Sequence, residues 1–310
     1  MKLHLLLALT LIFSSVACSP FKKAGKSIST AFDKNRTHQI EETDLFSPHE
    51  MALRPETSTR RNIEIPLSDG NVLRGIAMIR LEPRANIIYF GGNAELSQVA
   101  TTKITQWSEQ YQINVFFVDH RGYGASTGSP AVKNLADDAL QIFDGTSELR
   151  GDIPTIVVGY SIGSIPATYL AANRQVAGLA LMAPLTSFSD KDLFPKKQKR
   201  KLKPWYRVPF AKLIKVLPNF DIPENNEPLF QITAVKAEVL LIHGEADDVI
   251  PAQCSKKLFE LATSEKTLLL LPKHDHNNLS LTDGTGAIYF KTYLEKIMAS
   301  ESKYGIYSSH

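Results

Sequence analysis

The chain has 310 residues, of which 43% are hydrophobic, and a formal net charge of +3. This length and apolar content are enough for one sizeable buried core, such as an α/β domain of about 250 residues. The positive charge is mild and is not spread along a periodic face, which argues against a nucleic-acid-binding protein.

The first 17 residues are predicted to be a signal peptide. Lys2 provides a short positive region, and the apolar run from Leu5 to Phe13 is too short to span a bilayer. Small residues follow this run, as they do in secretory signals. We therefore expect the protein to be exported.

The end of this signal has two interpretations. In one, the peptide is cleaved after Ala17, with Ser15 two residues before the cut. In the other, the residues before Cys18 resemble a bacterial lipobox, in which the cysteine becomes the lipidated first residue; Ser15 then stands where Leu, Val or Ile is usual. A lipidated Cys18 would leave Cys254, the other cysteine of the chain, without a disulfide partner. The resemblance to bacterial lipoproteins, with Ser19 in place of Asp, implies an outer-membrane anchor facing the periplasm; the alternative is a soluble periplasmic or secreted protein.

Residues 18–58 are polar, carry several charges and show little periodicity, so they are predicted to form a tether. One folded domain is expected over residues 59–300. It opens with strand-like alternation from Asn62 to Leu67 and from Val72 to Leu81, on either side of the turn signal Ser68-Asp69-Gly70-Asn71. This hairpin predicts an antiparallel edge of a sheet.

Apolar runs alternate with helical patterns along the rest of the domain. The predicted strands are 86–90, 113–119, 155–159, 178–182, 239–243 and 267–271, and the predicted helices lie near 96–110, 132–148, 162–173, 252–263 and 285–299. Such alternation predicts an α/β fold, a mostly parallel twisted sheet with helices on both faces. Residues 301–310 are expected to form a C-terminal tail.

Residues 186–235 interrupt this alternation and are predicted to be a short cap insertion. They hold six prolines and a basic run at 196–203, which is followed by Trp205, Tyr206 and Phe210. These aromatic residues could form an apolar cap for an acyl chain, and the basic run could meet anionic lipid headgroups. The alternative for the basic run is a solvated surface.

The most informative motif is Gly159-Tyr160-Ser161-Ile162-Gly163. It follows an apolar run and precedes a helical pattern, so it lies where a buried strand turns into a helix. A G-x-S-x-G sequence at such a turn forms a nucleophile elbow, in which small residues permit a sharp bend that exposes the serine hydroxyl. Ser161 is therefore predicted to be a catalytic nucleophile.

A serine hydroxyl becomes a good nucleophile only with a histidine base and a carboxylate that supports the base. The acid candidates follow the predicted strand 239–243, at the end where such sheets carry their active residues. Asp247 is preferred over Asp248 and Glu245. The alternative is that this cluster only caps the next helix, which Pro251 opens.

Two histidines follow the last predicted strand, and His276 is preferred to His274 as the base from its place in the loop. For His274 the alternative is an exposed or supporting role. A metal site formed by His243, His274 and His276 is an alternative, but a serine nucleophile explains the same residues with fewer assumptions. The sequence has no dinucleotide fingerprint, P-loop or zinc-ligand spacing, so neither a cofactor nor a metal is predicted.

Serine hydrolases stabilise the developing oxyanion with two backbone N–H donors. One is expected from Ile162, the residue after the nucleophile. The other is expected from Asn93, in the loop after the predicted strand 86–90, where Gly91 and Gly92 allow the backbone to approach a ligand closely.

Five motifs in this order resemble those of the α/β-hydrolases, in particular the serine-aminopeptidase-like branch that includes eukaryotic protein depalmitoylases and lysophospholipid lipases. They are Tyr89–Ala94, Asp119–Gly128, Gly159–Gly163, His243–Pro251 and Asp275–Asn277. The resemblance, which covers residues 60–298, implies the α/β-hydrolase fold and a Ser161, Asp247 and His276 triad. The chain departs from the family pattern at Gly91, where His is usual, and at Asp275, where Gly is usual.

Together these observations predict an envelope-localised serine hydrolase that cleaves an ester or thioester of a small-molecule or lipid acyl substrate through an acyl-enzyme. A peptidase or amidase of the same fold is one alternative, and a non-catalytic envelope binding lipoprotein is the other. Contact with a membrane surface is expected through a lipid on Cys18 and through the basic run at 196–203.

Overall fold

The computed structural model describes residues 58–93, 95–187 and 223–304. The predicted signal peptide, the tether and Cys18 lie outside these residues. So do the basic run at 196–203, the aromatic residues that follow it and most of the predicted tail. In the part of the chain that is described, no helix is both long enough and apolar enough to cross a membrane.

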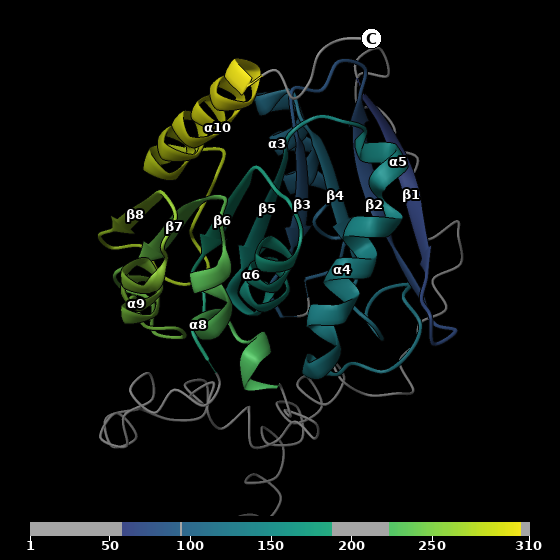
Figure 1. Cartoon of the computed structure of the whole chain (residues 1–310), viewed down its shortest axis with the longest axis horizontal. Coiled ribbons are helices and arrows are strands. Elements are labelled where there is room, and N and C mark those ends of the chain that lie inside the picture. Colours follow the sequence, from purple (N-terminus) through teal and green to yellow (C-terminus); the bar gives the residue numbers. More distant parts are fainter. Residues whose placement is uncertain (1–57, 94, 188–222, 305–310) are drawn as a thin grey trace, which may run out of the picture.

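An eight-stranded sheet forms the centre of the fold, in the order β1-β2-β4-β3-β5-β6-β7-β8 (Figure 1). The strands are β1 (Ser58–Pro66), β2 (Val72–Arg80), β3 (Asn86–Phe90), β4 (Asn114–Val118), β5 (Thr155–Tyr160), β6 (Gly178–Met182), β7 (Glu238–Gly244) and β8 (Lys266–Leu271). β2 runs antiparallel to both of its neighbours, and the other pairs are parallel. The predicted mostly parallel sheet with an antiparallel N-terminal edge is therefore confirmed.

Helices cover both faces of this sheet, as predicted (Figure 1). The helices α3 (Thr101–Tyr111) and α10 (Gly284–Tyr304) contribute to the core on one face. On the other face the core includes residues of α4 (Leu135–Gly145), α6 (Ser164–Asn173) and α9 (Gln253–Leu261). The shorter elements are α5 (Ser147–Arg150), α8 (Pro228–Gln231) and the 3-10 turns η2 (Val132–Asn134), η3 (Ser161–Gly163), η5 (Glu224–Asn226) and η6 (Ile232–Ala234).

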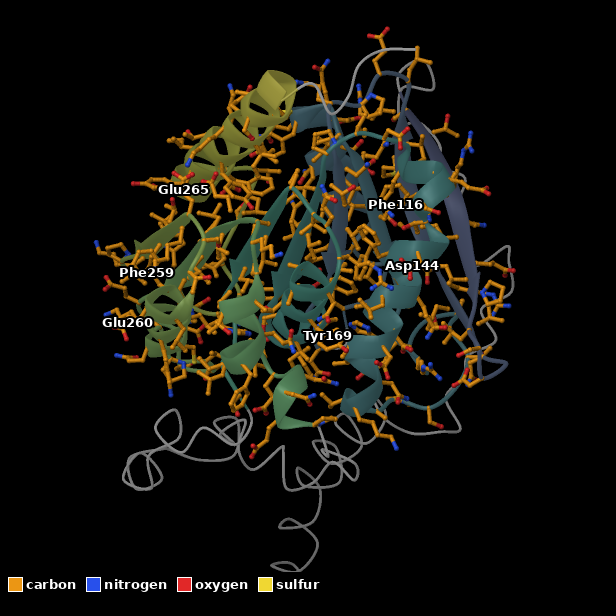
Figure 2. The ribbon with its side chains drawn as sticks, in the orientation of Figure 1. Phe116, Asp144, Tyr169, Phe259, Glu260 and Glu265 are labelled. Atoms are coloured by element: carbon orange, nitrogen blue, oxygen red, sulfur yellow. The ribbon has the colours of Figure 1, made fainter. Side chains whose placement is uncertain are left out.

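The central strands are apolar on both faces because helices cover both. Every residue of β3 and of β4 is buried. Successive side chains of a strand point to opposite faces, and Phe116 (labelled in Figure 2) and Phe117 accordingly belong to the two different cores. This explains why the central strands read as continuous apolar runs rather than as alternating ones.

Three helix starts differ from the sequence prediction, and one of them is the helix expected from residue 132, which begins as the 3-10 turn η2 before α4 starts at Leu135. α3 begins at Thr101 rather than near residue 96, because the chain before it is tied to the end of β4: the backbone N–H and the hydroxyl of Ser97 donate to the Asp119 carboxylate over 2.6 and 2.9 Å. The helix after β5 begins as the 3-10 turn η3 before α6 continues it. Of the predicted cap insertion, the structure describes residues 186–187 and 223–235.

Candidate active site

The turn after β5 is sharp and leaves no room for side chains on its glycines. Ser161 has a φ of 56°, a left-handed conformation that is uncommon for a residue with a side chain. A Cβ on Gly159 would lie 2.6 Å from the Ala167 Cβ, and one on Gly163 would lie 2.1 Å from the Phe90 carbonyl oxygen. The G-x-S-x-G spacing therefore follows from close contact of this turn with α6 and β3.

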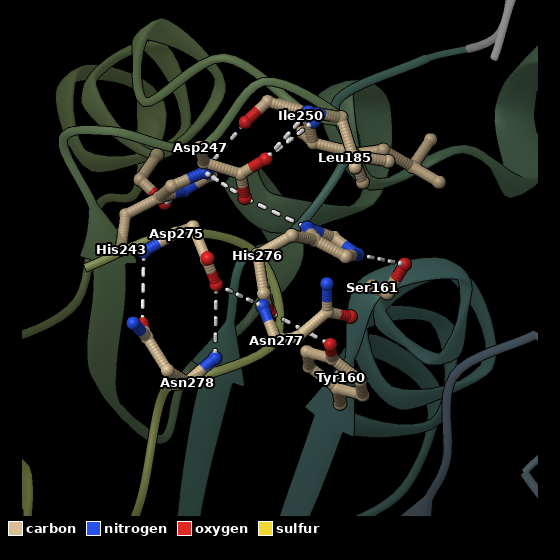
Figure 3. A network of polar contacts seen from close by, with 12 residues as sticks. Tyr160, Ser161, Leu185, His243, Asp247, Ile250, Asp275, His276, Asn277 and Asn278 are labelled. Atoms are coloured by element: carbon tan, nitrogen blue, oxygen red, sulfur yellow. Dashed lines mark hydrogen bonds and ion pairs between the residues drawn. The ribbon is translucent and has the colours of Figure 1, made fainter. Parts of the chain in front are cut away.

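The structure brings Ser161, His276 and Asp247 together, as Figure 3 shows. His276 Nε2 lies 3.0 Å from Ser161 Oγ, and His276 Nδ1 lies 2.7 Å from Asp247 Oδ2. Ser161 is 5% exposed and His276 is 7% exposed. Of the two candidate histidines, it is thus His276 that contacts the serine, while His274 Nδ1 lies 3.1 Å from the Pro272 carbonyl oxygen.

The Asp247 carboxylate is fully buried and is surrounded by donors. Its Oδ1 accepts hydrogen bonds from the backbone N–H groups of Val249 and Ile250, each over 2.8 Å. Burial by itself raises the pKa of this carboxyl, but the hydrogen bonds from His243 and His276 outweigh burial and hold its pKa below the ordinary value. Asp247 therefore stays ionised at neutral pH and keeps a proton on His276 Nδ1. The other two acid candidates, Glu245 and Asp248, are exposed.

His243 is a second histidine on this carboxylate, a role that was not predicted from its place at the start of the motif His243–Pro251. It is completely buried, and its Nε2 lies 2.9 Å from the Ile250 carbonyl oxygen and 3.3 Å from Asp247 Oδ2. Because both of these oxygens are acceptors, Nε2 carries the proton, and Nδ1 accepts from the Ser255 hydroxyl over 2.7 Å. The spacing of four residues between His243 and Asp247, directly after a buried strand, is the signal that could have revealed this contact.

The loop after β3 lies against the nucleophile turn. A Cβ on Gly92 would be 2.9 Å from the Tyr160 ring and 3.7 Å from the Ser161 Cβ, so a side chain at this position would displace the Tyr160 ring. Asn93 directly follows Gly92, and Ile162 directly follows Ser161. The two predicted oxyanion donors therefore lie in two segments that pack against each other. The Asn93 side chain is exposed and accepts a long hydrogen bond, 3.4 Å, from the Tyr123 hydroxyl.

Asp275, one of the two departures from the family pattern, shapes the loop of His276 (Figure 3). Its Oδ1 accepts from the backbone N–H groups of Asn277 and Asn278 over 2.8 and 3.2 Å, and its own N–H donates to the Asn278 side chain. The Tyr160 hydroxyl donates to the His276 carbonyl oxygen over 2.8 Å. The loop that carries His276 is thus held by hydrogen bonds within the loop and by one hydrogen bond from Tyr160, the residue before Ser161.

No group of three or more His, Cys, Asp or Glu side chains within the described ranges is arranged to hold a metal ion.

Comparison with known proteins identifies the family. The model of the serine aminopeptidase S33 family matches residues 81–232. Human alpha/beta hydrolase domain-containing protein 17B is 30% identical over 224 residues, which cover 71% of this chain and 67% of the human protein. The chain belongs to the α/β-hydrolase superfamily. The uncharacterized protein YfhR of Escherichia coli, 25% identical over 265 residues, extends the similarity to 83% of this chain and 87% of the relative.

The other similarities are lower in identity or cover less of the proteins compared. The uncharacterized protein Rv2307c of Mycobacterium tuberculosis is 30% identical over 175 residues, and the match spans just over half of each protein, 56%. Among solved structures, the Pyrococcus furiosus esterase Pf2001 has a TM-score of 0.56 at 15% identity and covers 83% of this chain and 95% of its own. The DcsB complex with its substrate analogue has a TM-score of 0.58 at 18% identity, with 78% and 99% covered. At these identities the structures support the fold alone.

Proposed function

We propose that this protein is a serine hydrolase that cleaves an ester or thioester bond of an acyl-bearing substrate. The observation that carries the proposal is the continuous chain of hydrogen-bond distances from Ser161 Oγ through His276 to Asp247, 3.0 and then 2.7 Å. Such a chain provides what a serine nucleophile needs, a base within reach and a carboxylate that orients the base.

In the proposed reaction, His276 Nε2 takes the proton of Ser161 as Oγ attacks the carbonyl carbon. The resulting oxyanion accepts hydrogen bonds from the backbone N–H groups of Ile162 and Asn93. The tetrahedral intermediate collapses, and His276 gives its proton to the departing alcohol or thiol. A water molecule, deprotonated by His276, then attacks the acyl-enzyme, releases the acid and restores the serine.

The ionised Asp247 has two effects in this cycle. It holds the neutral imidazole of His276 in the tautomer that leaves Nε2 free to accept a proton. It also stabilises the imidazolium that forms when the proton has moved. His243 and the two backbone donors fix the carboxylate, so its orientation changes little while the charge on His276 changes.

An apolar cluster beside the nucleophile supports an acyl substrate. Leu185 and Ile250 are buried in it, and Val132, Ile162 and Val249 pack against it while remaining partly exposed. Ile162 directly follows the serine, and Val249 lies two residues after the acid. The partly exposed side chains therefore offer an apolar surface where the hydrocarbon part of an acyl group would lie, and burying such a chain contributes about 0.8 kcal/mol per CH₂.

The test is hydrolysis of p-nitrophenyl esters from acetyl to palmitoyl by the wild type, by Ser161→Ala and by Ser147→Ala. Ser147 is an exposed serine at the start of α5, which precedes β5, and it serves as the matched control. We expect turnover in the wild type and control and its loss in Ser161→Ala. Turnover that survives Ser161→Ala would overturn the proposal, and serine-dependent cleavage of amides only would replace the esterase by the peptidase interpretation.

We also propose that the protein is exported to a bacterial cell envelope and anchored by a lipid on Cys18, on the sequence pattern described above. Labelling with a palmitate analogue in a bacterial host tests this, with Cys254→Ala as the cysteine control. The proposal expects label and membrane association to disappear in Cys18→Ala and to persist in the control. Unlabelled wild-type protein in the soluble periplasmic fraction would favour an ordinary cleaved signal.

A further inference from the structure

A charged network lies beside the loop that follows β3. The Glu95 side chain, 18% exposed, uses both of its oxygens. Oε2 accepts hydrogen bonds from the Gly92 N–H over 2.9 Å and from the Tyr89 hydroxyl over 2.8 Å, and Oε1 lies 2.6 Å from Lys103 Nζ. Lys103 also donates to the Tyr89 oxygen over 3.0 Å, so the three side chains form a closed polar network around one loop amide.

Aromatic rings hold this network in place. Lys103 Nζ lies 4.9 Å from the ring centre of Tyr89, 5.7 Å from that of Trp107 and 5.6 Å from that of Tyr160. A cation at such distances is attracted to ring faces. Burial, together with the charge of Glu95, raises the pKa of Tyr89 well above its ordinary value, so its hydroxyl remains a donor to Glu95. The lysine thus connects β3, α3 and the residue before Ser161.

Glu95 also fixes the direction of the next peptide group. Its backbone N–H donates to the Gly92 carbonyl oxygen over 3.2 Å, while its carboxylate accepts from the Gly92 N–H. The carbonyl of Gly92 and the N–H of Asn93 belong to one peptide, and in a trans peptide the two groups point in opposite directions; none of the described peptide bonds is cis. The backbone bond to the Gly92 carbonyl therefore also sets where the Asn93 N–H points. The Glu95 carboxylate holds the other side of Gly92, through its N–H, so the side chain fixes the peptide that precedes this one and keeps Gly92 from turning.

The network occupies the space beside Gly91. A Cβ at that position would lie 2.9 Å from Glu95 Oε2 and 2.8 Å from the Phe117 Cζ. Side chains packed on one side of Gly91 and the Tyr160 ring packed against Gly92 leave the loop little freedom to shift. The carboxylate is thus held where it contacts backbone, rather than being free to point into solvent.

We propose that Glu95, neutralised and held by Lys103, is a positioning residue that sets the Asn93 N–H of the oxyanion hole. The proposal rests on the serine-hydrolase function proposed above. An unpaired carboxylate this close to the hole would oppose the negative charge that develops on the substrate oxygen. The ion pair with Lys103 removes this conflict, because it lets the carboxylate bind the loop amide without adding a net charge.

The experiment compares Glu95→Ala, Glu95→Gln and Lys103→Met with the wild type in p-nitrophenyl butyrate hydrolysis, with kcat and KM measured separately. Loss of one oxyanion donor costs about 10²–10³ in kcat, and a misplaced donor costs part of this. We expect kcat to fall about 10- to 100-fold in Glu95→Ala with KM within about twofold. Glu95→Gln should lose less, because its amide oxygen can still accept from Gly92, and Lys103→Met should lie in between.

A tetrahedral-state mimic separates positioning from general damage. The Kd of a trifluoromethyl ketone inhibitor should rise in Glu95→Ala by about the factor by which kcat falls, since both depend on the oxyanion hole. The matched control is Glu295→Ala, which removes an exposed ion pair with Arg84 of similar length, 2.9 Å, next to the N-terminal end of β3. It should change neither kcat nor the inhibitor Kd.

Three results would overturn the proposal. One is a kcat of Glu95→Ala within threefold of the wild type, and another is a loss no larger than that of Glu295→Ala. The third is a fall in kcat with an unchanged inhibitor Kd. If Glu95→Ala does not fold, the same comparison applies to Glu95→Gln and Lys103→Met. Turnover that persists in Ser161→Ala, measured alongside, would instead refute the serine-hydrolase function itself.

Discussion

Replacement of Asp247 by asparagine is expected to lower turnover. The effect follows from the four hydrogen-bond donors that surround the carboxylate. Oδ1 accepts from the backbone N–H groups of Val249 and Ile250, and Oδ2 faces Nδ1 of His276 and Nε2 of His243. Backbone N–H groups cannot become acceptors. The amide oxygen of the introduced asparagine must therefore take the place of Oδ1, and its NH₂ group must face His276.

This orientation reverses the tautomer of His276. An NH₂ group can only donate, so Nδ1 must give up its proton and Nε2 must carry it. Nε2 then points a proton at Ser161 and can no longer accept one. We expect kcat to fall about 10³- to 10⁴-fold, which corresponds to about 4–5.5 kcal/mol of lost transition-state stabilisation.

The assay is p-nitrophenyl butyrate hydrolysis by Asp247→Asn and by Asp248→Asn, with urea unfolding of both to confirm that they are folded. Asp248 is the exposed neighbour, so its variant should retain wild-type turnover. A kcat of Asp247→Asn above about a tenth of the wild-type value would refute the tautomer argument. Equal losses in the two variants would refute the assignment of the acid.

Other predictions concern packing and pH. Gly163→Ala places a Cβ 2.1 Å from the Phe90 carbonyl oxygen, so we expect the Tm to fall by roughly 5 °C or more, and an unchanged Tm contradicts this. Burial raises the pKa of Asp119 to about 6, so the folded state binds an extra proton at pH 4–6. The unfolding free energy of the wild type relative to Asp119→Asn should then fall with rising pH, by up to about 1.4 kcal/mol per pH unit. Burial lowers the pKa of His120 to about 4, so the unfolding free energy relative to His120→Gln should rise between pH 4 and 6.5. Urea unfolding at several pH values measures both dependences. If the two relative unfolding free energies change with pH in the same direction, this pair of predictions is contradicted.

The strands and the order of the motifs were accessible from the sequence because both are local properties. Parallel strands covered on both faces are largely apolar, as β3 and β4 are after their first residues, Asn86 and Asn114, and this pattern is visible in the sequence. The strand order was not accessible, since the pairing of β4 between β2 and β3 depends on contacts between distant segments. The late start of α3 has the same origin, because Asp119 at the end of β4 binds Ser97.

The candidate site, like the fold, was predictable from the sequence only in part. Ser161, Asp247 and His276 follow strand ends in motifs that the sequence displays. The contacts that hold them are less visible. His243 meets Asp247 because its buried side chain, at the end of β7, faces the acid loop. The role of Glu95 is not visible in the sequence, because it depends on a lysine in α3 and a tyrosine in β3 that no spacing rule connects.

The most direct test of the account is intact-mass spectrometry after reaction with a fluorophosphonate probe, followed by peptide mapping. The account predicts one covalent adduct per wild-type chain, located on Ser161, and no adduct on Ser161→Ala under the same conditions. An adduct at another residue, equal labelling of Ser161→Ala, or a folded wild type that does not react over a range of pH would contradict it.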